Sequence, residues 1–545
     1  MTVAEQIVQI LEERGVEYVF GLPGEENIAL VNALHKSEKV KFILVQDEQS
    51  GAFMAGLVGW LTGKPGVIVA TLGPGALNMV LSVADAHTHS FPLIAIAAQG
   101  ELKDRVRETT QMVDLKSVYT PITKWSEDLV VLESTTEIIN KAYNVAMTER
   151  KGATFVTIPT SLEQESFGET SQTIIQSPTA QTVATKAALL KAADLLKKAQ
   201  KPMIIAGLGV SRENVSLELR TFIKKHNIPV ATSFMAKGAV PETSELSMGV
   251  VGFFVKDYID SEMKEADLIL AIGYDFSEFN PSQINPNKDK IIVNLHTFVQ
   301  ETHENFSLDV QLVGDLTKNI EGLSNALGSY QANASNSLVR EKLNTEFNQG
   351  EQEGEVPLKP VQIVHAIRQA LPKNGKVLID TGAVKMWMAR LFPAYDLNTV
   401  LINNALSSMS WAIPGTIAAK LLNPDTSMLT VVGDGGFHMS SSEIATAKKY
   451  NIPLTILIWD DSAYGLIKWK MELDLGEHSE IEFNNPDFIK IAEAYGGHGF
   501  VVNSRNELEE RVKSCLEKDE GINIIVAPVD YRDNMELTEE LDKNT

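Results

Sequence analysis

Short apolar runs alternate with segments of helical periodicity along most of the chain. A strand that is buried on both faces reads as a continuous apolar run, whereas the intervening segments place apolar residues on one helical face. This alternation predicts α/β domains in which helices cover both faces of a doubly wound parallel sheet. The expected strands are FILVQ (42–46), GVIVATL (66–72), LIAIAAQ (93–99), TFVTIP (154–159), PMIIAG (202–207), LILAIG (268–273), KIIVNL (290–295), KVLIDTG (376–382), MLTVVGDGG (428–436), LTILIWDD (454–461) and INIIVAPV (522–529).

Two polar stretches divide these runs into three groups. Residues 164–182 are rich in Ser, Thr and Gln, and a second polar connection follows residue 328 and ends in NQGEQEGEVP. A chain of 545 residues is also too long for a single hydrophobic core. We therefore expect three α/β domains, at residues 1–165, 183–330 and 355–535. No short-period repeat is visible, but the first and third domains could share an architecture.

The composition of the chain argues against several classes of function. A net charge of -23 argues against a nucleic-acid or anionic membrane surface, because binding phosphates needs clustered Lys and Arg. The single cysteine, Cys515, excludes an internal disulfide framework and fits a reducing compartment. No apolar run approaches the roughly 18 residues that span a bilayer, and the first 20 residues have the spacing of an amphipathic helix. These features predict a cytoplasmic protein.

The strongest chemical signal is a pair of aspartates that follow two successive strands. One strand ends at Gly433-Asp434-Gly435-Gly436, and the next ends at Asp460-Asp461. The carboxyl ends of strands in a doubly wound sheet bind ligands, and glycines allow a phosphate to approach the backbone. Two hard oxygen ligands together with phosphate oxygens suit Mg²⁺. The alternative is that GDGG forms only a tight turn.

GDGG followed after roughly 25 residues by an acidic pair resembles the diphosphate signature of thiamine diphosphate enzymes. The usual second element of that family is Asn-Asn, and Asp460-Asp461 departs from it while retaining a carboxylate. The resemblance implies that Asp434, Asp461 and the carbonyl of Ala463 hold the metal. It extends over nearly the whole chain and is closest to catabolic acetolactate synthases, which implies a pyrimidine domain, a central domain and a diphosphate domain. The implied cofactor-binding residues beside the metal are Gly433, Gly435, Gly436, Tyr464, Gly465 and Leu466.

The first domain carries the residues that resemble the pyrimidine side of that family. VEYVFGLPGEEN (16–27) contains Gly24, and Glu48 follows a strand in VQDEQSG (45–51). LGPGALN (72–78) supplies Pro74 and Asn78. The resemblance implies that Glu48 bonds the pyrimidine ring and stabilises its imino form, which then removes the proton from the thiazolium carbon.

Further segments match the family on both sides of the expected cofactor. DTGAVKMWMAR (380–390) would place Ala383 beside the diphosphate, and INNALSSMSWAIPG (402–415) would place the Ser407 carbonyl near the 4′-amino group. Met409 would be the apolar residue under the bent cofactor. RETTQMVDLKSVYTPITKW (107–125) resembles the segment with the active-site glutamine, here Gln111, which could donate to a substrate oxygen.

The resemblance implies a reaction of 2-oxo acids. Acetolactate formation from two pyruvates is the expected activity, in a homodimer or homotetramer whose sites lie between subunits. A decarboxylase that releases an aldehyde is the alternative, and a non-catalytic homologue is a third possibility that intact Glu48, Asp434 and Asp461 count against. Four departures from catabolic members leave the substrate open: Glu26, Asp47, Thr110 and Val384.

Other patterns are weaker. His87 and His89 have metal-ligand spacing without a third ligand nearby, so we expect a loop pair at the mouth of the active site, in which either residue could shuttle a proton. GLGVSRENV (207–215) is an incomplete dinucleotide motif, and FAD is not expected because catabolic relatives do not bind it. Lys468 or Lys470 could supply a positive charge to the substrate pocket. Phe91 and Trp469 could line that pocket, but aromatic residues are more often part of the core.

Overall fold

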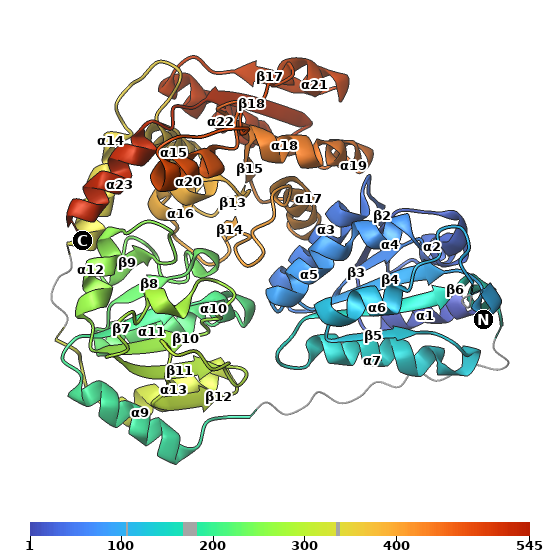
Figure 1. Cartoon of the computed structure of the whole chain (residues 1–545), viewed down its shortest axis with the longest axis horizontal. Coiled ribbons are helices and arrows are strands. Elements are labelled where there is room, and N and C mark those ends of the chain that lie inside the picture. Colours follow the sequence, from blue (N-terminus) through green and yellow to red (C-terminus); the bar gives the residue numbers. More distant parts are fainter. Residues whose placement is uncertain (105–106, 167–181, 334–337, 545) are drawn as a thin grey trace. The chain divides into compact units, whose positions relative to one another are not determined.

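The computed structural model describes residues 1–104, 107–166, 182–333 and 338–544, and it contains three six-stranded sheets. Every strand pair in these sheets is parallel, which confirms the predicted fold class (Figure 1). The chain forms two compact units. The first unit comprises Met1–Thr179, Ile417–Pro424 and Ser440–Tyr450, and the second comprises Ala180–Thr416, Asp425–Met439 and Asn451–Thr545.

The first sheet belongs to the first unit and has helices on both faces. Helices α3 (Glu48–Thr62) and α5 (Val80–Thr88) lie on one face, and α1 (Val3–Glu13) and α7 (Thr135–Met147) lie on the other (Figure 1). The three strands β3, β4 and β6 are completely buried, which is why they read as continuous apolar runs. The strand order is β2 (Lys41–Leu44), β1 (Tyr18–Gly21), β3 (Gly66–Ala70), β4 (Leu93–Gln99), β6 (Ala153–Pro159) and β5 (Trp125–Asp128).

The second sheet has the strand order of a dinucleotide-binding fold, in which the chain starts at the centre and winds outward in both directions. Helices α9 (Lys186–Lys198), α11 (Ser216–His226) and α13 (Leu316–Leu327) bury their apolar stripes in one core with its central strands. The strand order is β12 (Val310–Val313), β11 (Ile291–His296), β10 (Leu268–Ile272), β7 (Pro202–Ala206), β8 (Val230–Thr232) and β9 (Ser247–Val250).

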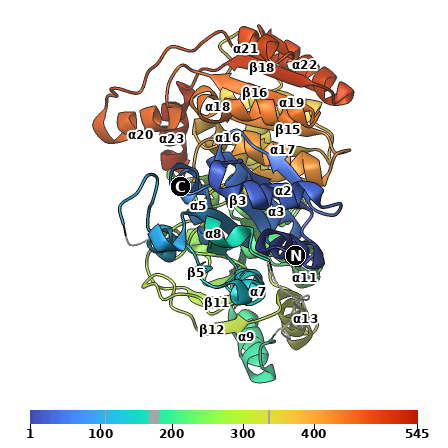
Figure 2. The ribbon, with the colours of Figure 1, turned by 90° about the vertical axis from the view of Figure 1, so that its right-hand side faces the viewer.

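The third sheet repeats the strand order of the first, so the two domains share an architecture as the sequence suggested. Helix α21 (Phe488–Ala494) lies beside β17 (His498–Val501) and β18 (Ile522–Pro528), and α22 (Arg505–Lys518) lies beside β16 (Leu454–Asp460) and β18 (Figure 2). The strand order is β14 (Val400–Ile402), β13 (Lys376–Ile379), β15 (Met428–Gly433), β16 (Leu454–Asp460), β18 (Ile522–Pro528) and β17 (His498–Val501).

The connection before the third domain is partly helical between its two polar stretches. Helix α14 (Val339–Gln349) forms there and buries Val339 and Leu343. Two apolar residues one turn apart are enough to anchor a helix but too few to stand out in a polar stretch. Most of the first predicted connection, at 167–181, lies outside the described residues. In the part of the chain that the structure describes, no helix has both the length and the apolar character to cross a membrane.

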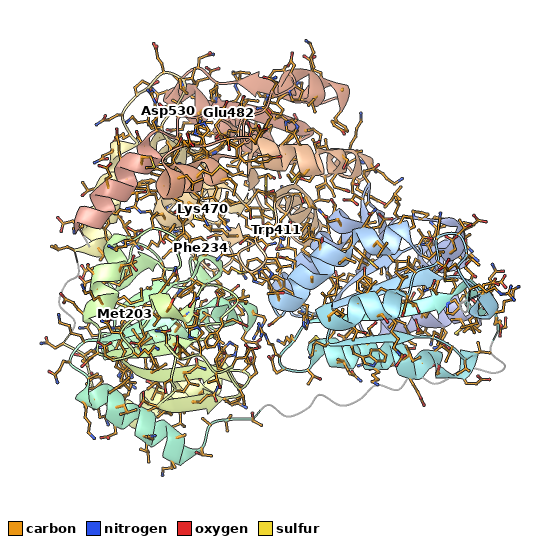
Figure 3. The ribbon with its side chains drawn as sticks, in the orientation of Figure 1. Met203, Phe234, Trp411, Lys470, Glu482 and Asp530 are labelled. Carbon is orange, nitrogen blue, oxygen red and sulfur yellow. The ribbon has the colours of Figure 1, made fainter. Side chains whose placement is uncertain are left out.

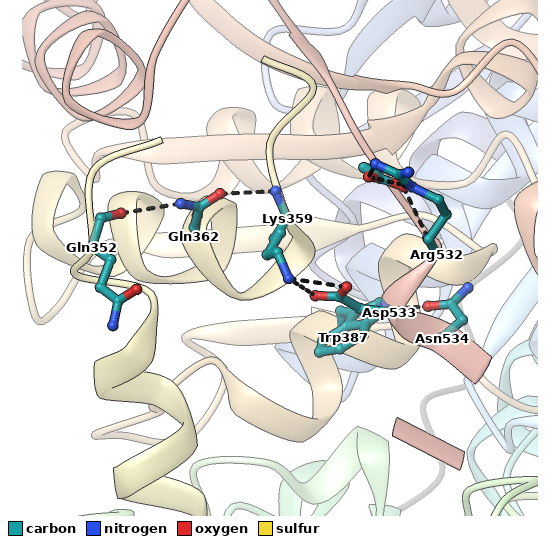
Figure 4. Close-up of polar contacts among 8 residues, drawn as sticks. Gln352, Lys359, Gln362, Trp387, Arg532, Asp533 and Asn534 are labelled. Atoms are coloured by element: carbon teal, nitrogen blue, oxygen red, sulfur yellow. Dashed lines mark hydrogen bonds and ion pairs between the residues drawn. The ribbon is translucent and has the colours of Figure 1, made fainter. Parts of the chain in front are cut away.

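The end of the chain is anchored to the third domain. The Lys359 ammonium group, just before helix α15 (Pro360–Ala370), contacts Asp533 at 3.0 Å. The indole N–H of Trp387, in helix α16 (Ala383–Leu391), donates to Asn534 at 2.8 Å (Figure 4). These contacts fix the start of helix α23 (Asp533–Asn544) and therefore the position of the preceding Tyr531.

Candidate active site

Three strand-to-helix junctions meet at one edge of the third sheet and form a pocket. Strand β13 leads into α16, β15 leads into α18 (Asp434–Ser440), and β16 leads into α20 (Gly465–Leu475). Of the twelve residues that the sequence placed on the diphosphate side, all except Ser407 line this pocket. The lining residues are Thr381, Gly382, Ala383, Val384, Met409, Gly433, Asp434, Gly435, Gly436, Asp461, Ala463, Tyr464, Gly465, Leu466, Ile467 and Tyr531.

The pocket suits an anion. Free backbone N–H groups at helix N-termini carry partial positive charge, and the first residues of α16, α18 and α20 all line the pocket. A side chain added at Gly433 would meet no atom within 4 Å, so the backbone there borders open space. A Cβ atom at Gly435 would lie 2.8 Å from the Tyr464 ring, so a larger residue would disturb the pocket wall.

The carboxylates of Asp434 and Asp461 face this pocket. Burial raises the pKa of both groups, and their mutual repulsion further raises that of Asp461. Asp460 is not among the lining residues, and its Oδ1 atom accepts hydrogen bonds from the Ser462 amide at 3.2 Å and from Asn485 at 2.8 Å. The tertiary structure therefore places Asp461 rather than Asp460 in the pocket.

The donor set fits a divalent metal. No described residue donates a hydrogen bond to the Ala463 carbonyl, which is left available beside the two carboxylates. The described residues contain no cluster of three or more His, Cys, Asp or Glu side chains that could hold a metal ion. Two carboxylates, a carbonyl and an adjoining anion pocket match the needs of Mg²⁺, which takes few protein ligands and binds phosphate oxygens.

In the first unit, Glu48 begins helix α3 at the carboxyl end of β2. Its side chain is 3% exposed, and its Oε2 atom accepts a hydrogen bond from the Asn78 amide at 3.0 Å. A Cβ atom at Gly75 would lie 2.8 Å from Oε1, so the glycine lets the turn approach the carboxylate. Asp47 caps α3 by accepting from the Gln49 amide at 3.3 Å, which gives this departure from the family a structural role.

The other residues predicted on the pyrimidine side lie at the same sheet edge. Gly24 packs against Thr71, and Pro74 is the first residue of the short helix α4 (Pro74–Asn78). A Cβ atom at Gly73 would lie 2.5 Å from the Gln111 carbonyl oxygen, so Gln111 borders the glycine turn with its side chain exposed. The structure brings these residues together with Glu48 in one unit.

Two polar residues near these sites, Asn485 and Glu443, were not predicted from the sequence. Asn485 bonds Asp434, and Glu443 accepts hydrogen bonds at 3.0 Å from the amides of Gln46 and Asp47, the two residues before Glu48. Burial raises the pKa of Glu443 to about 7. No local pattern marks either residue, because each acts on a segment remote in sequence.

The histidine expectation was wrong. His87 lies in helix α5 and His89 is its C-cap residue, so neither is part of a loop. His89 is buried, its Nδ1 atom lies 2.7 Å from the Asp85 carbonyl oxygen, and its ring stacks on Phe91. Phe91 and Trp469 are both buried core residues, which is the usual position of aromatic side chains.

The two lysines that could supply a positive charge to the substrate pocket, Lys468 and Lys470, both lie on helix α20. Lys470, on that helix, places its ammonium group 5.0 Å from the centre of the Phe254 ring (Figure 3). Lys468 forms an ion pair with Glu482 at 3.6 Å. The buried Lys385 ammonium group, which does not line the pocket, donates to the Ser407 hydroxyl at 3.0 Å, and Ser407 has a φ of 53°.

In the central domain, the glycine turn after β7 is occupied by the side chain of Glu278. The Glu278 carboxylate accepts hydrogen bonds at 2.9 Å from the Leu208 and Asp275 amides, and a Cβ atom at Gly207 would lie 2.5 Å from its Oε1. In dinucleotide-binding folds this turn holds the pyrophosphate. A buried carboxylate occupies the same kind of anion site here.

Comparison with known proteins identifies similar chains along the whole length. Residues 1–118, 189–323 and 380–526 match the models of the N-terminal, central and C-terminal domains of thiamine pyrophosphate enzymes. The acetolactate synthase of Bacillus subtilis is 30% identical, with 98% of this chain and 94% of that protein covered. The catabolic acetolactate synthase of Raoultella terrigena is 29% identical, with 97% and 95% covered. A probable acetolactate synthase large subunit of Methanocaldococcus jannaschii is also 29% identical, with 97% and 92% covered.

Proposed function

Because the chain belongs to the thiamine pyrophosphate enzyme family, we propose that it joins two 2-oxo acids with loss of carbon dioxide, and that pyruvate yields 2-acetolactate. The observation that carries this proposal is the pocket where Asp434, Asp461 and the Ala463 carbonyl adjoin three helix N-termini. The names of the similar proteins support the choice of acetolactate among the products open to such an enzyme.

The residues of the pocket have separate roles in this proposal. Asp434, Asp461 and the Ala463 carbonyl would hold Mg²⁺, and the helix N-termini would bind the diphosphate group beside it. Met409 lines the same pocket and supports the cofactor from one side. The Glu278 side chain supports the expectation that the central domain works without FAD, since it already occupies backbone amides of the turn where a pyrophosphate would bind.

Glu48 carries the acid–base step. Thiamine diphosphate supplies a nucleophilic carbon and an electron sink for the decarboxylation of 2-oxo acids. Glu48 would hold a proton at the pyrimidine nitrogen of the bound cofactor, and the Asn78 amide orients its carboxyl group. Its burial excludes water that would otherwise compete for that proton.

The products distinguish this function from its alternative. Purified protein with Mg²⁺ and thiamine diphosphate is supplied with pyruvate and then with bulkier 2-oxo acids, and the products are identified by mass spectrometry. We expect 2-hydroxy-2-acyl acids, with 2-acetolactate from pyruvate. Release of aldehydes alone would assign a decarboxylase, and the absence of any turnover of 2-oxo acids would refute the proposal.

One observation favours the decarboxylase. The Glu26 carboxylate accepts a hydrogen bond from Thr71, and the Thr71 methyl group lies beside Gly75, the glycine that contacts Glu48. A second carboxylate at this sheet edge can repel the carboxylate of an acceptor 2-oxo acid and so favour release of an aldehyde over carboligation. Glu26→Gln should then shift products from aldehyde toward carboligation if Glu26 has this role.

We further propose a homodimer or homotetramer in which two copies complete each active site. Exposed apolar side chains flank both sets of site residues: Ile28 and Leu77 in the first unit, and Leu406 and Ile467 in the second, are 41–59% exposed. Exposed apolar residues of this kind mark interaction surfaces when they gather around a site.

Mixing two inactive variants tests this assembly. The Glu48→Gln chain retains Asp434, and the Asp434→Ala chain retains Glu48. After dissociation and reassembly, half of the dimers contain one copy of each, so about a quarter of the wild-type activity should return if sites are shared. No recovery in a mixture shown to exchange subunits would indicate sites built from one chain.

A further inference from the structure

A short segment, residues 481–485, runs antiparallel to the residues that present Ala463. The Phe483 amide donates to the Ser462 carbonyl at 2.9 Å, and the Tyr464 amide donates to the Ile481 carbonyl at 3.0 Å. These two bonds flank Ala463 and leave its own carbonyl free for another partner. Glu482, opposite Ala463, marks the segment in Figure 3.

Asn485, at the end of this segment, bonds two of the three aspartates. Its Nδ2 atom donates to Asp434 Oδ2 at 2.7 Å and to Asp460 Oδ1 at 2.8 Å. Its Oδ1 atom lies 2.8 Å from Nε2 of His438, which can donate to it. The reverse orientation would point an amide oxygen at two carboxylates, so the bonding chemistry fixes which end faces them.

The Asp434 carboxylate is held by donors from three segments of the chain. Oδ1 accepts from the Gly435 amide at 2.8 Å, and Oδ2 accepts from the Ser462 amide at 2.7 Å as well as from Asn485. With both hydrogen bonds on Oδ2, the carboxylate cannot rotate freely, and Oδ1 keeps a lone pair for the pocket. Asn485 supplies the only side-chain donor to Asp434 among the described residues.

We propose that Asn485 is the positioning residue of the metal site, and that His438 orients its amide group. The inference rests on the proposed function, because it concerns the same metal. Asn485 cannot itself be a ligand in this arrangement, since its amide N–H groups face the carboxylates and its oxygen faces His438. Its role is to hold Asp434 and Asp460 in place, while the backbone of the segment 481–485 fixes Ala463.

Metal affinity, measured without turnover, tests this role. Asn485→Ala and Asn485→Leu remove the donor, and Asn484→Ala is the matched control because Asn484 is exposed and makes no contact with Asp434. Binding of Mn²⁺ in the presence of thiamine diphosphate is followed by electron paramagnetic resonance. We expect both Asn485 variants to raise the Mn²⁺ Kd about 10–100-fold, the range for residues that orient metal ligands. At saturating Mn²⁺, kcat should recover to within a few-fold of wild type.

His438→Ala supplies a second, independent variant. His438 is exposed, so its loss should not disturb folding, and the Mn²⁺ Kd should rise by a smaller factor than for Asn485→Ala. The double variant should be no worse than Asn485→Ala alone, because His438 acts through that amide. A Kd within twofold of wild type in the Asn485 variants and in His438→Ala overturns the proposal. Wild-type protein that binds no Mn²⁺ overturns the metal site itself and the proposed function with it.

Discussion

The carboxyl group of Glu163 gives a pH-dependent test of the structure away from the active site. It follows strand β6, is 3% exposed, and accepts hydrogen bonds from the Ala29 and Leu30 amides at the start of helix α2 (Ile28–Lys36). No described group bonds its Oε1 atom. Burial, and to a smaller extent the nearby Glu26, raise the pKa of Glu163 from 4.5 to about 8.

The difference in proton binding between the folded and unfolded states decides whether stability rises or falls with pH. Between pH 4.5 and about 8 the folded protein keeps the Glu163 proton, whereas the unfolded chain has lost it. The unfolded state then binds fewer protons, so stability is highest below the unfolded pKa and falls as pH rises toward 8. At about 1.4 kcal/mol per pH unit, the shift corresponds to at most about 5 kcal/mol, which local relaxation reduces to about 2–4 kcal/mol.

Glu163→Gln removes this dependence. The glutamine keeps an oxygen for the helix amides but cannot ionise, and its NH₂ group lacks an acceptor at the Oε1 position, as does the O–H group of the protonated carboxyl. The variant should therefore be close to wild type in stability at pH 5 and should exceed it at pH 8.

Thermal unfolding from pH 5 to 8.5 measures the difference in Tm between variant and wild type. We expect this difference to move by about 4–16 °C in favour of Glu163→Gln across the range, at roughly 2–4 °C per kcal/mol for domains of this size. Glu165→Gln is the matched control, because Glu165 is exposed and its loss should leave the profile unchanged. A Tm difference that stays constant to within 1 °C would show that the Glu163 carboxyl is not buried in protonated form.

Three further substitutions have defined outcomes. Glu48→Gln should retain thiamine diphosphate binding by calorimetry while kcat falls about 10²–10⁴-fold, because only the proton transfer is lost; an unaffected kcat would remove Glu48 from the mechanism. Asp434→Ala should instead abolish metal and cofactor binding together, and normal binding would refute its assignment as a ligand. Gly66→Ala should lower the free energy of unfolding by about 1–3 kcal/mol or more, since its Cβ atom would lie 1.9 Å from the Ala55 carbonyl oxygen. Gly63→Ala is the control: its Cβ atom meets nothing within 4 Å, so only the strain of a φ of 68°, about 1 kcal/mol, remains.

The fold class was predictable because its signal is local. Strands β4, β6 and β16 are buried almost throughout and appear in the sequence as unbroken apolar runs. Strands β8 and β14 have three residues each, and β17 is a partly exposed edge strand, so none of them forms a run long enough to recognise. Their place in the sheets depends on the neighbours with which they pair.

The sequence by itself marked the aspartates at strand ends and the glycine turns by their place beside apolar runs, whereas the choice of Asp461 and of Glu48 came from the resemblance to the family. The tertiary structure supplies the reason why Asp461 rather than Asp460 faces the pocket: the two are adjacent in sequence, but Asp460 accepts hydrogen bonds from the Ser462 amide and from Asn485. Only the tertiary structure brought Asn485 to Asp434, 51 positions away in the chain. Periodicity records which face of an element is buried, whereas a hydrogen bond between remote loops depends on the packed arrangement of the elements that carry them.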